Sequence, residues 1–257
     1  MISAREVADE LIIAERERKK LTAFTDAHPD FDVAEGYAAQ RLFVQSKVDA
    51  GEQIIGAKLG LTSRAKQVAM GVSDPLYGMV TNRMVAPAAL PVDLAALIHP
   101  RVEPEIAFLL ARDVTAPASI TSVLAATEAV FAAVDVLDSR YNDYRFALAD
   151  VVADNCSAGR FLLGPTARTP DELVDLRLLG CVLRVNGEVV DTAAGAAVMG
   201  HPAASVAWLA NRLGECGEVL RGGWLVFSGG LTAPIPLQPG RTVTAEFDGL
   251  GTVSAFA

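Results

Sequence analysis

The segment 98–108, with the sequence IHPRVEPEIAF, places two carboxylates one residue apart in a stretch that otherwise reads as buried. Its prolines disfavour a helix, and its apolar residues favour an extended, buried chain. Residues i and i+2 of a strand share a face, so Glu103 and Glu105 are predicted to project side by side. Two buried like charges repel, and a bound divalent cation would neutralise them. The alternative is an edge strand with a solvated acidic face.

A second acidic cluster follows in AAVDVLDSRY, where Asp135 and Asp138 interrupt an apolar run that is typical of a buried strand. Carboxylates without a histidine or cysteine partner form a hard oxygen donor set, which suits Mg²⁺ or Mn²⁺ better than zinc. Each acid could instead be paired with Arg101 or Arg140, the usual environment of a buried carboxylate. The residues by themselves leave both interpretations open.

Composition limits the partners of the chain. Its 257 residues are 51% hydrophobic with a mean hydropathy of +0.32, which predicts a large core and apolar surface buried between subunits of a homo-oligomer. The net charge of −9 and the pI near 4.9 argue against nucleic acid and against an anionic membrane as partners. An anionic small substrate therefore needs local cations.

Targeting and redox signals point to the cytoplasm. The longest apolar segments, 85–97 and 129–137, contain prolines or acids and are shorter than the ~20 residues that span a bilayer. Residues 1–20 carry acids early and lack an uninterrupted apolar stretch, so no secretory signal is expected. The cysteines are odd in number and lack C-x-x-C spacing, which favours reduced, structural thiols: Cys156, Cys181 and Cys216.

The first part of the chain is predicted to be helical. Ser3 with Glu6, and Asp32 with Glu35, match the pattern of a capping box, and each pair opens an amphipathic run. The second run ends near Gly51. Two N-terminal helices are therefore expected.

From Gln53 onward the pattern changes to strands. QIIGAKLGLTS predicts a strand and a glycine-containing turn, and Ser63 could cap a short helix through Met70. VLRVNGEVVD predicts a hairpin with a type I′ turn at Asn186-Gly187, and RTVTAEFDGLGTVSAF predicts a second pair of strands. Helical patterns interrupt the strands near 120–131, 171–176 and 202–213. The fold class is therefore α+β.

Several motifs occur in the order seen in a known family: GAKLGLTS, HPRVEPEIAF, VDVLDSRY, VVADNCSAGRFLLG, GAAVMGHP and SGGLTAPIPLQPG. From about Asp26 to the C-terminus the chain resembles the 4-oxalocrotonate (2-oxo-3-hexenedioate) decarboxylases. These enzymes belong with the 2-keto-4-pentenoate hydratases in the fumarylacetoacetate hydrolase superfamily. DSRYNDYRFALADVVADN resembles the decarboxylase version of its region. A hydratase, an acylpyruvate hydrolase and a non-catalytic partner subunit of a hydratase are the alternatives.

The resemblance implies a fold and a metal site. The fold is a mixed β-sheet roll of the fumarylacetoacetate hydrolase type, with an N-terminal helical region at 1–75 and a metal-binding catalytic domain at 76–257. Glu103, Glu105 and Asp135 fall on the metal-ligand positions of the family. Relatives usually carry glutamate at the last position, so the shorter arm of Asp135 requires a backbone shift or a bridging water.

The resemblance also assigns catalytic and binding roles. Lys58 falls on the active-site lysine of the family; its alternative role is a strand-end lysine that extends its charge into water. Asn155, Ser157 and Thr232 are candidate donors to the substrate carboxylates, although the first two could simply cap a turn. His201 precedes a proline and is better explained as a helix-entry residue than as a base.

The implied reaction is the metal-dependent decarboxylation of 2-oxo-3-hexenedioate, a small 2-oxo dicarboxylic acid, to 2-hydroxypenta-2,4-dienoate and CO₂. The implied cofactor is Mg²⁺ or Mn²⁺. The implied setting is the catabolism of aromatic ring-cleavage products, where a hydratase consumes this product and is an expected physical partner.

Overall fold

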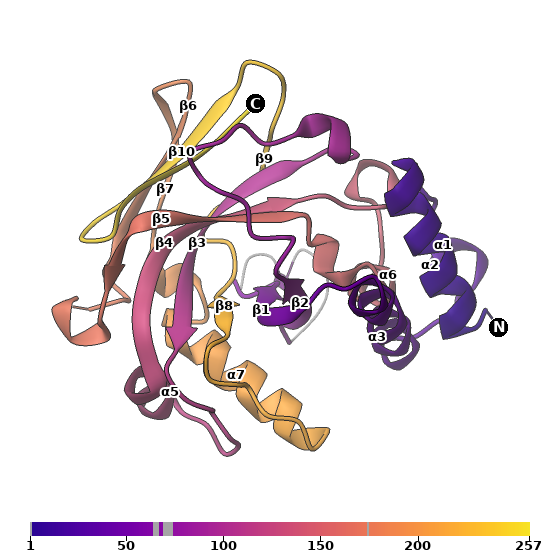
Figure 1. The fold of residues 1–257 in the computed structure, drawn as a ribbon, viewed down its shortest axis with the longest axis horizontal. Coiled ribbons are helices and arrows are strands. Elements are labelled where there is room, and N and C mark those ends of the chain that lie inside the picture. Colours follow the sequence, from indigo (N-terminus) through magenta and orange to yellow (C-terminus); the bar gives the residue numbers. More distant parts are fainter. Residues whose placement is uncertain (1, 64–66, 69–73, 174) are drawn as a thin grey trace.

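Two β-sheets and a group of N-terminal helices make up the fold (Figure 1). The computed structural model describes residues 2–63, 67–68, 74–173 and 175–257. The larger sheet has the strand order β2-β1-β8-β3-β4-β5, with β9 paired to β3. The smaller sheet has the order β11-β10-β6-β7.

The N-terminal helices and α6 pack together on one side of the molecule (Figure 1). Ser3 and Glu6 form the predicted capping box, and the Asp32 carboxylate accepts a hydrogen bond from the Glu35 backbone N–H. The helices are α1 (Ala4–Glu17), α2 (Phe24–Ala27), α3 (Val33–Asp49) and α6 (Leu148–Ala153). The predicted N-terminal helices are confirmed.

The larger sheet is buried on both faces at its centre. The strands are β1 (Ile54–Gly60), β2 (Leu76–Thr81), β3 (Arg101–Leu110), β4 (Thr127–Leu137), β5 (Arg160–Arg168), β8 (Leu225–Phe227) and β9 (Ile235–Pro236). Val102, Ile106 and Phe108 belong to the main hydrophobic core, whereas Ala107 belongs to a separate apolar cluster. Because side chains alternate along a strand, Glu103 and Glu105 share the face of Ala107.

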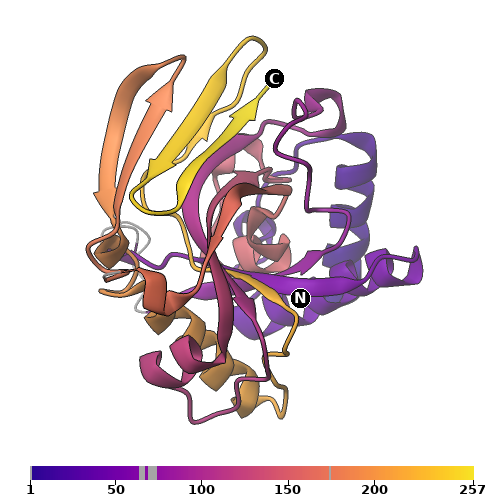
Figure 2. The same cartoon turned by 60° about the vertical axis from the view of Figure 1, so that its left-hand side comes forward.

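The smaller sheet consists of the two predicted hairpins, which are confirmed. Its strands are β6 (Gly180–Val185), β7 (Glu188–Ala194), β10 (Thr242–Phe247) and β11 (Gly251–Phe256). Asn186 and Gly187 have φ of 51° and 89°, as a type I′ turn requires. Strand β11 packs against β4 and β5, and Figure 2 shows this sheet beside the strongly curved larger one.

Two helices pack against each other at the end of the larger sheet that lies away from the smaller sheet (Figure 2). They are α5 (Ile120–Ala126) and α7 (Pro202–Glu215). The helix predicted over 120–131 ends at Ala126, because the following residues form β4 and pair with β3 and β5. The His201 ring accepts a hydrogen bond from the Ala203 N–H at the start of α7, which confirms its role at the helix entry.

Short 3₁₀ turns connect these elements: η1 (Leu94–Ala96), η2 (Asn142–Tyr144), η3 (Asn155–Ser157), η4 (Pro170–Glu172) and η5 (Gly195–Ala197). Of the helix predicted over 171–176, the structure contains only the single 3₁₀ turn η4, which ends at Glu172, and residue 174 lies outside the described residues. The short helix predicted from Ser63 through Met70 falls mostly outside the described residues.

The run of N-terminal helices ends with α3 at Asp49. The boundary expected at residue 75 lies between β1 and β2, which pair with each other in the larger sheet. In the described parts of the chain, no helix is long and apolar enough to cross a membrane.

Candidate active site

Three buried carboxylates lie on neighbouring positions of β3 and β4 in the larger sheet. Glu103 and Glu105 alternate along β3, and Asp135 on β4 lies directly opposite Glu103 in the antiparallel register. Glu105 and Asp135 have no solvent exposure, and Glu103 is 7% exposed. The edge-strand alternative is therefore wrong, since β3 is central in the sheet and its acids are buried.

Lys58 on β1 lies beside these acids. Its Nζ is 2.5 Å from Asp135 Oδ2 and donates a hydrogen bond to the Cys156 carbonyl at 2.8 Å. Burial lowers the pKa of Lys58, but the negative charges of Asp135 and Glu105 outweigh that effect and leave the pKa raised. Lys58 is 2% exposed, so this lysine does not extend its charge into water.

Glu105 is held at one oxygen only. Its Oε2 accepts a hydrogen bond from the Gly229 N–H at 2.8 Å, whereas Oε1 is buried and has no hydrogen-bond partner among the described residues. Burial and the nearby charge of Asp135 raise the pKa of Glu105 well above its usual range, and Lys58 partly opposes them. A cation at this oxygen would stabilise the ionised carboxylate.

Gly229 reaches Glu105 because it has no side chain. Its φ is +111°, and a Cβ atom at this position would lie 2.0 Å from Thr62 Oγ1. Only glycine combines this backbone conformation with so close an approach. Gly229, in the motif SGGLTAPIPLQPG, therefore shapes the site.

The chemical type of the three side chains suits a hard divalent cation. All three groups are carboxylates, they are buried, and Glu105 Oε1 lacks a partner among the described residues. Within the described residues, no group of three acidic, histidine or cysteine side chains is arranged closely enough to coordinate a metal ion. Lys58 is the cation in contact with Asp135 in this structure. Metal binding would therefore require the three carboxylates to move closer together. The Lys58 ammonium would also have to move away from Asp135.

The turn at 155–157 positions Lys58. Asn155, Cys156 and Ser157 have consecutive φ values of 49°, 54° and 56°, which is unfavourable backbone for residues other than glycine. The Asn155 side chain stabilises the turn from β2: its Oδ1 accepts from the Met79 N–H at 2.8 Å, and its Nδ2 donates to the Met79 carbonyl at 2.9 Å. The result is a Cys156 carbonyl aimed at Lys58.

In this structure the Asn155 side chain supports the fold around the site. Its amide is committed to the backbone of β2 and does not line the cavity beside Lys58. Ser157 does line the cavity, and its hydroxyl donates to Asp154 Oδ2 at 3.3 Å. Thr232 is nearly buried, and its hydroxyl donates to the Ala233 carbonyl at 3.2 Å outside the cavity wall.

Asp138 and Arg140 make structural contacts away from the three acids of the site. The Asp138 carboxylate accepts hydrogen bonds from the backbone N–H groups of Ile98 and His99. Arg140 is fully buried and forms an ion pair with Asp154. Arg140 therefore neutralises Asp154 and not the three acids of the site.

The thiols fit the structural role predicted for them. All three cysteines are free, and only Cys216 is exposed. Burial raises the pKa of Cys156 and of Cys181 to about 12, so both remain protonated.

A cavity of about 310 Å³ opens beside these charges. Its polar lining includes Lys58, Glu103 and Ser157, together with Arg101 and Tyr144, which the sequence did not single out as site residues. The remaining wall is largely apolar: Leu59, Leu61, Leu76, Leu137, Phe146, Val151 and Pro234. A signal for Arg101 was available, since it stands two residues before Glu103 and so shares its strand face.

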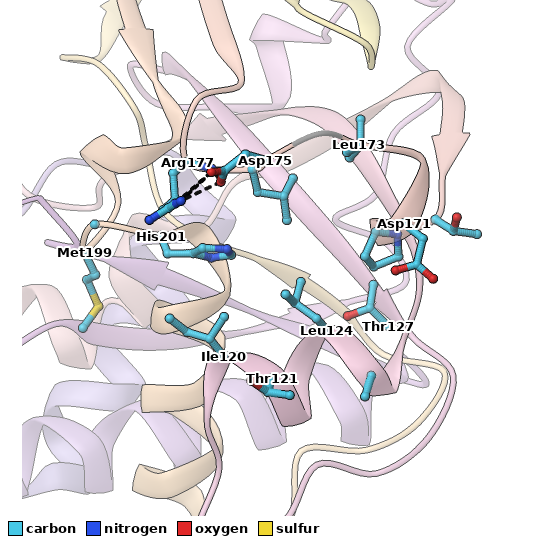
Figure 3. Close-up of a pocket in the computed structure, with 15 residues that line it drawn as sticks. Ile120, Thr121, Leu124, Thr127, Asp171, Leu173, Asp175, Arg177, Met199 and His201 are labelled. Carbon is cyan, nitrogen blue, oxygen red and sulfur yellow. Dashed lines mark hydrogen bonds and ion pairs between the residues drawn. The ribbon is translucent and has the colours of Figure 1, made fainter.

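A larger hollow of about 1110 Å³ lies elsewhere, between α5, η4 and the start of α7 (Figure 3). Two of its charged side chains pair with each other: Arg177 Nη2 lies 2.6 Å from Asp175 Oδ2. His201 is engaged at the helix entry, and Leu124 and Ile120 line the wall below it (Figure 3). None of the predicted site residues lines this hollow.

A buried lysine beside buried carboxylates at a small cavity is the kind of site expected in an enzyme, because such charges are costly to bury without a function. The chain belongs to the fumarylacetoacetate hydrolase family: residues 53–255 match the family described as "Fumarylacetoacetate (FAA) hydrolase C-terminal". The fold and family inferred from the sequence motifs are confirmed.

Known relatives cover nearly the whole chain. It is 42% identical over 250 residues to a 4-oxalocrotonate decarboxylase of Pseudomonas sp. strain CF600, covering 97% of this chain and 94% of that protein. It is 41% identical over 215 residues to a 2-hydroxypent-2,4-dienoate hydratase of Pseudomonas putida, covering 82% and 96%. The solved 4-oxalocrotonate decarboxylase from Pseudomonas putida G7, complexed with magnesium and adipate, is 39% identical with a TM-score of 0.95, covering 100% and 98%.

Proposed function

We propose that this protein is a carboxy-lyase that decarboxylates 2-oxo-3-hexenedioate (4-oxalocrotonate) to 2-hydroxypenta-2,4-dienoate and CO₂ with a bound Mg²⁺ or Mn²⁺. The observation that carries the proposal is the Lys58–Asp135 contact beside Glu103 and Glu105, next to a small cavity that Lys58 and Glu103 line. The decarboxylase relative is similar along nearly the whole chain, which supports the same assignment.

Glu103, Glu105 and Asp135 are the proposed metal ligands. When bound, a divalent metal supplies Lewis acidity toward the 2-oxo group of the substrate. The magnesium in the similar solved decarboxylase supports this choice. Buried hydrogen bonding from Gly229 keeps one oxygen of Glu105 fixed and leaves the other available.

The chain's own residues stabilise the charge that develops. In 2-oxo-3-hexenedioate the bond between C5 and the distal carboxylate breaks, CO₂ leaves, and the electron pair spreads through the conjugated carbons to the C2 oxygen. Protonation of that oxygen gives 2-hydroxypenta-2,4-dienoate. The ammonium of Lys58, held by Asp135 and by the Cys156 carbonyl, is placed to stabilise the dienolate charge.

The apolar part of the cavity supports the same step. Apolar walls keep water away from the conjugated carbons over which the negative charge spreads, so the charged groups of the site act on that charge in a medium of low dielectric. Leu76, Leu137 and Phe146 line the cavity and limit water beside the reacting bond. Ser157 and Thr232 are retained as proposed donors to the substrate carboxylates, and Asn155 is proposed as a positioning residue.

The runner-up function is hydration of 2-hydroxypenta-2,4-dienoate, because the hydratase relative is 41% identical over most of the chain. A hydratase must hold a water and an acid–base group against a carbon of the diene. The two reactions are separated by incubating the purified protein with Mg²⁺ and each substrate. Release of CO₂ from 2-oxo-3-hexenedioate supports the decarboxylase, whereas formation of 4-hydroxy-2-oxopentanoate from the dienoate, without CO₂ release, would replace it with the hydratase.

The wider setting remains a prediction. We expect a catabolic route for aromatic ring-cleavage products, in which a hydratase consumes the dienoate and associates with this enzyme. A homo-oligomer and a cytoplasmic location are also expected. Mass photometry of the protein alone and with a pathway hydratase would test both associations.

A further inference from the structure

We propose that Arg101, held against Tyr144, binds the distal carboxylate of the substrate and makes the site selective for dicarboxylates. The inference rests on the proposed function, because it assigns a second charge on the same ligand to a residue of the same cavity. It would place a cation at the outer end of the site, opposite the ammonium of Lys58.

Three adjacent positions on one strand face define the axis of the site. Arg101, Glu103 and Glu105 alternate along β3, and their partners on β4 are Leu137, Asp135 and Ala133. Arg101 and Leu137 both line the cavity. The guanidinium thus enters the cavity one strand repeat away from the nearest proposed metal ligand.

The spacing matches the proposed substrate. Residues i and i+2 of a strand are separated by roughly 6.8 Å. This is comparable to the length of an extended six-carbon dicarboxylate. If the 2-oxo acid end lies at Glu103 and Glu105, the other carboxylate reaches the position of Arg101. A monocarboxylate of the same length would leave that cation without a partner.

Tyr144 fixes the direction of the guanidinium. The Arg101 Cζ lies 4.0 Å from the centre of the Tyr144 ring, in a cation–π contact. The tyrosine is itself anchored, because its hydroxyl donates to the Leu137 carbonyl at 3.0 Å. A guanidinium already stacked on a ring loses less freedom when it forms a bidentate pair with a carboxylate. Tyr144 therefore acts as a positioning residue.

The chemistry explains why this cation suits recognition better than catalysis. The distal carboxylate carries its full charge before the reaction and loses it as CO₂ departs. An ion pair with Arg101 therefore stabilises the bound substrate more than the transition state. The product retains one carboxylate, at the other end, so the same pairing favours product release.

The test is equilibrium binding of two six-carbon probes in the presence of Mg²⁺. Titration calorimetry would compare adipate, a dicarboxylate, with hexanoate, its monocarboxylate counterpart, on the unmodified protein and on Arg101→Gln. We expect adipate to bind more tightly to the unmodified protein, and Arg101→Gln to lose about tenfold or more of that preference. Arg83→Gln, an exposed arginine outside the cavity, is the matched control for net charge and should keep the preference.

Arg101→Lys and Tyr144→Leu make the test independent of one substitution. Arg101→Lys keeps the charge and should retain part of the preference, and Tyr144→Leu should lose part of it with Arg101 intact. An equal preference in Arg101→Gln and the unmodified protein would overturn the inference, as would an unmodified protein that binds both probes alike. Failure of the proposed function is separate, since it would appear as absent CO₂ release in a protein that still prefers adipate.

Discussion

The small cavity at Lys58 and the large hollow at His201 differ in how their charges are used. In the small cavity the ammonium of Lys58 and the acids beside it are almost fully buried, and Glu105 Oε1 has no hydrogen-bond partner among the described residues. In the large hollow Asp175 pairs with an exposed Arg177, and His201 caps a helix. The larger volume therefore marks a surface feature, and the smaller one marks the reactive site.

The difference is one of free energy. A buried carboxylate without a partner costs several kcal/mol unless a ligand or ion completes it. Exposed ion pairs such as Asp175–Arg177 are worth little, because solvent screens them. Incomplete pairing inside the protein is a better guide to function than the size of an opening. The following experiments test that contrast, from the largest expected effect to the smallest.

Metal removal should have the largest effect. We expect excess EDTA to abolish CO₂ release and added Mg²⁺ or Mn²⁺ to restore it, because the proposed site is built from carboxylates. Glu105→Gln should also lose activity while remaining folded, since an amide is a poorer ligand for a hard cation. Glu128→Gln, an exposed acid on the neighbouring strand β4, is the matched control. Full activity in EDTA, with no metal detected by elemental analysis, would refute the metal site.

Loss of the buried ammonium should come next. We expect Lys58→Ala to lower kcat and kcat/KM together by roughly 10² to 10³, because a charge that stabilises the transition state is removed. Lys58→Arg should recover only part of the rate, since a planar guanidinium does not replace a compact ammonium. Lys19→Ala, at an exposed site, is the control. An increase in KM at unchanged kcat, measured as CO₂ release at saturating substrate, would reassign Lys58 to substrate binding.

A smaller effect is expected at Asp135. We predict that Asp135→Glu keeps or increases Mg²⁺ affinity in a calorimetric titration, because the ligand charge is retained and the arm is longer. The extra methylene enters a fully buried position and should lower the free energy of unfolding by about 1–3 kcal/mol. A folded variant that no longer binds metal would show that the backbone is adapted to aspartate, or that Asp135 is not a ligand.

The smallest effect is expected in the large hollow. Arg177→Gln removes one partner of an exposed ion pair, and we expect kcat and KM to change by no more than about twofold. The same assay of CO₂ release serves for all variants. A loss comparable to that of Lys58→Ala would mean that the large hollow takes part in the reaction and that the contrast between the two cavities is misleading.

The sequence alone determined the features that depend on neighbours along the chain. The two-residue period of a strand placed Glu103 beside Glu105, and capping patterns located the starts of α1 and α3. The Asn186-Gly187 turn followed from the positive φ values that these residue types tolerate. Motif order supplied the family. These signals act over a few residues, so they survive without knowledge of the fold.

Only the tertiary structure decided what the distant segments do to one another. The sheet order brings Lys58 on β1 to Asp135 on β4, and no local pattern encodes that contact. Pairing with β3 and β5 likewise extended β4 back to Thr127, where local periodicity predicted a helix. The amide of Asn155, a predicted substrate donor, hydrogen-bonds to the Met79 backbone on β2, a contact that no local pattern predicts. Cross-strand register and burial are set by packing of the whole core, and for that reason they override local preference.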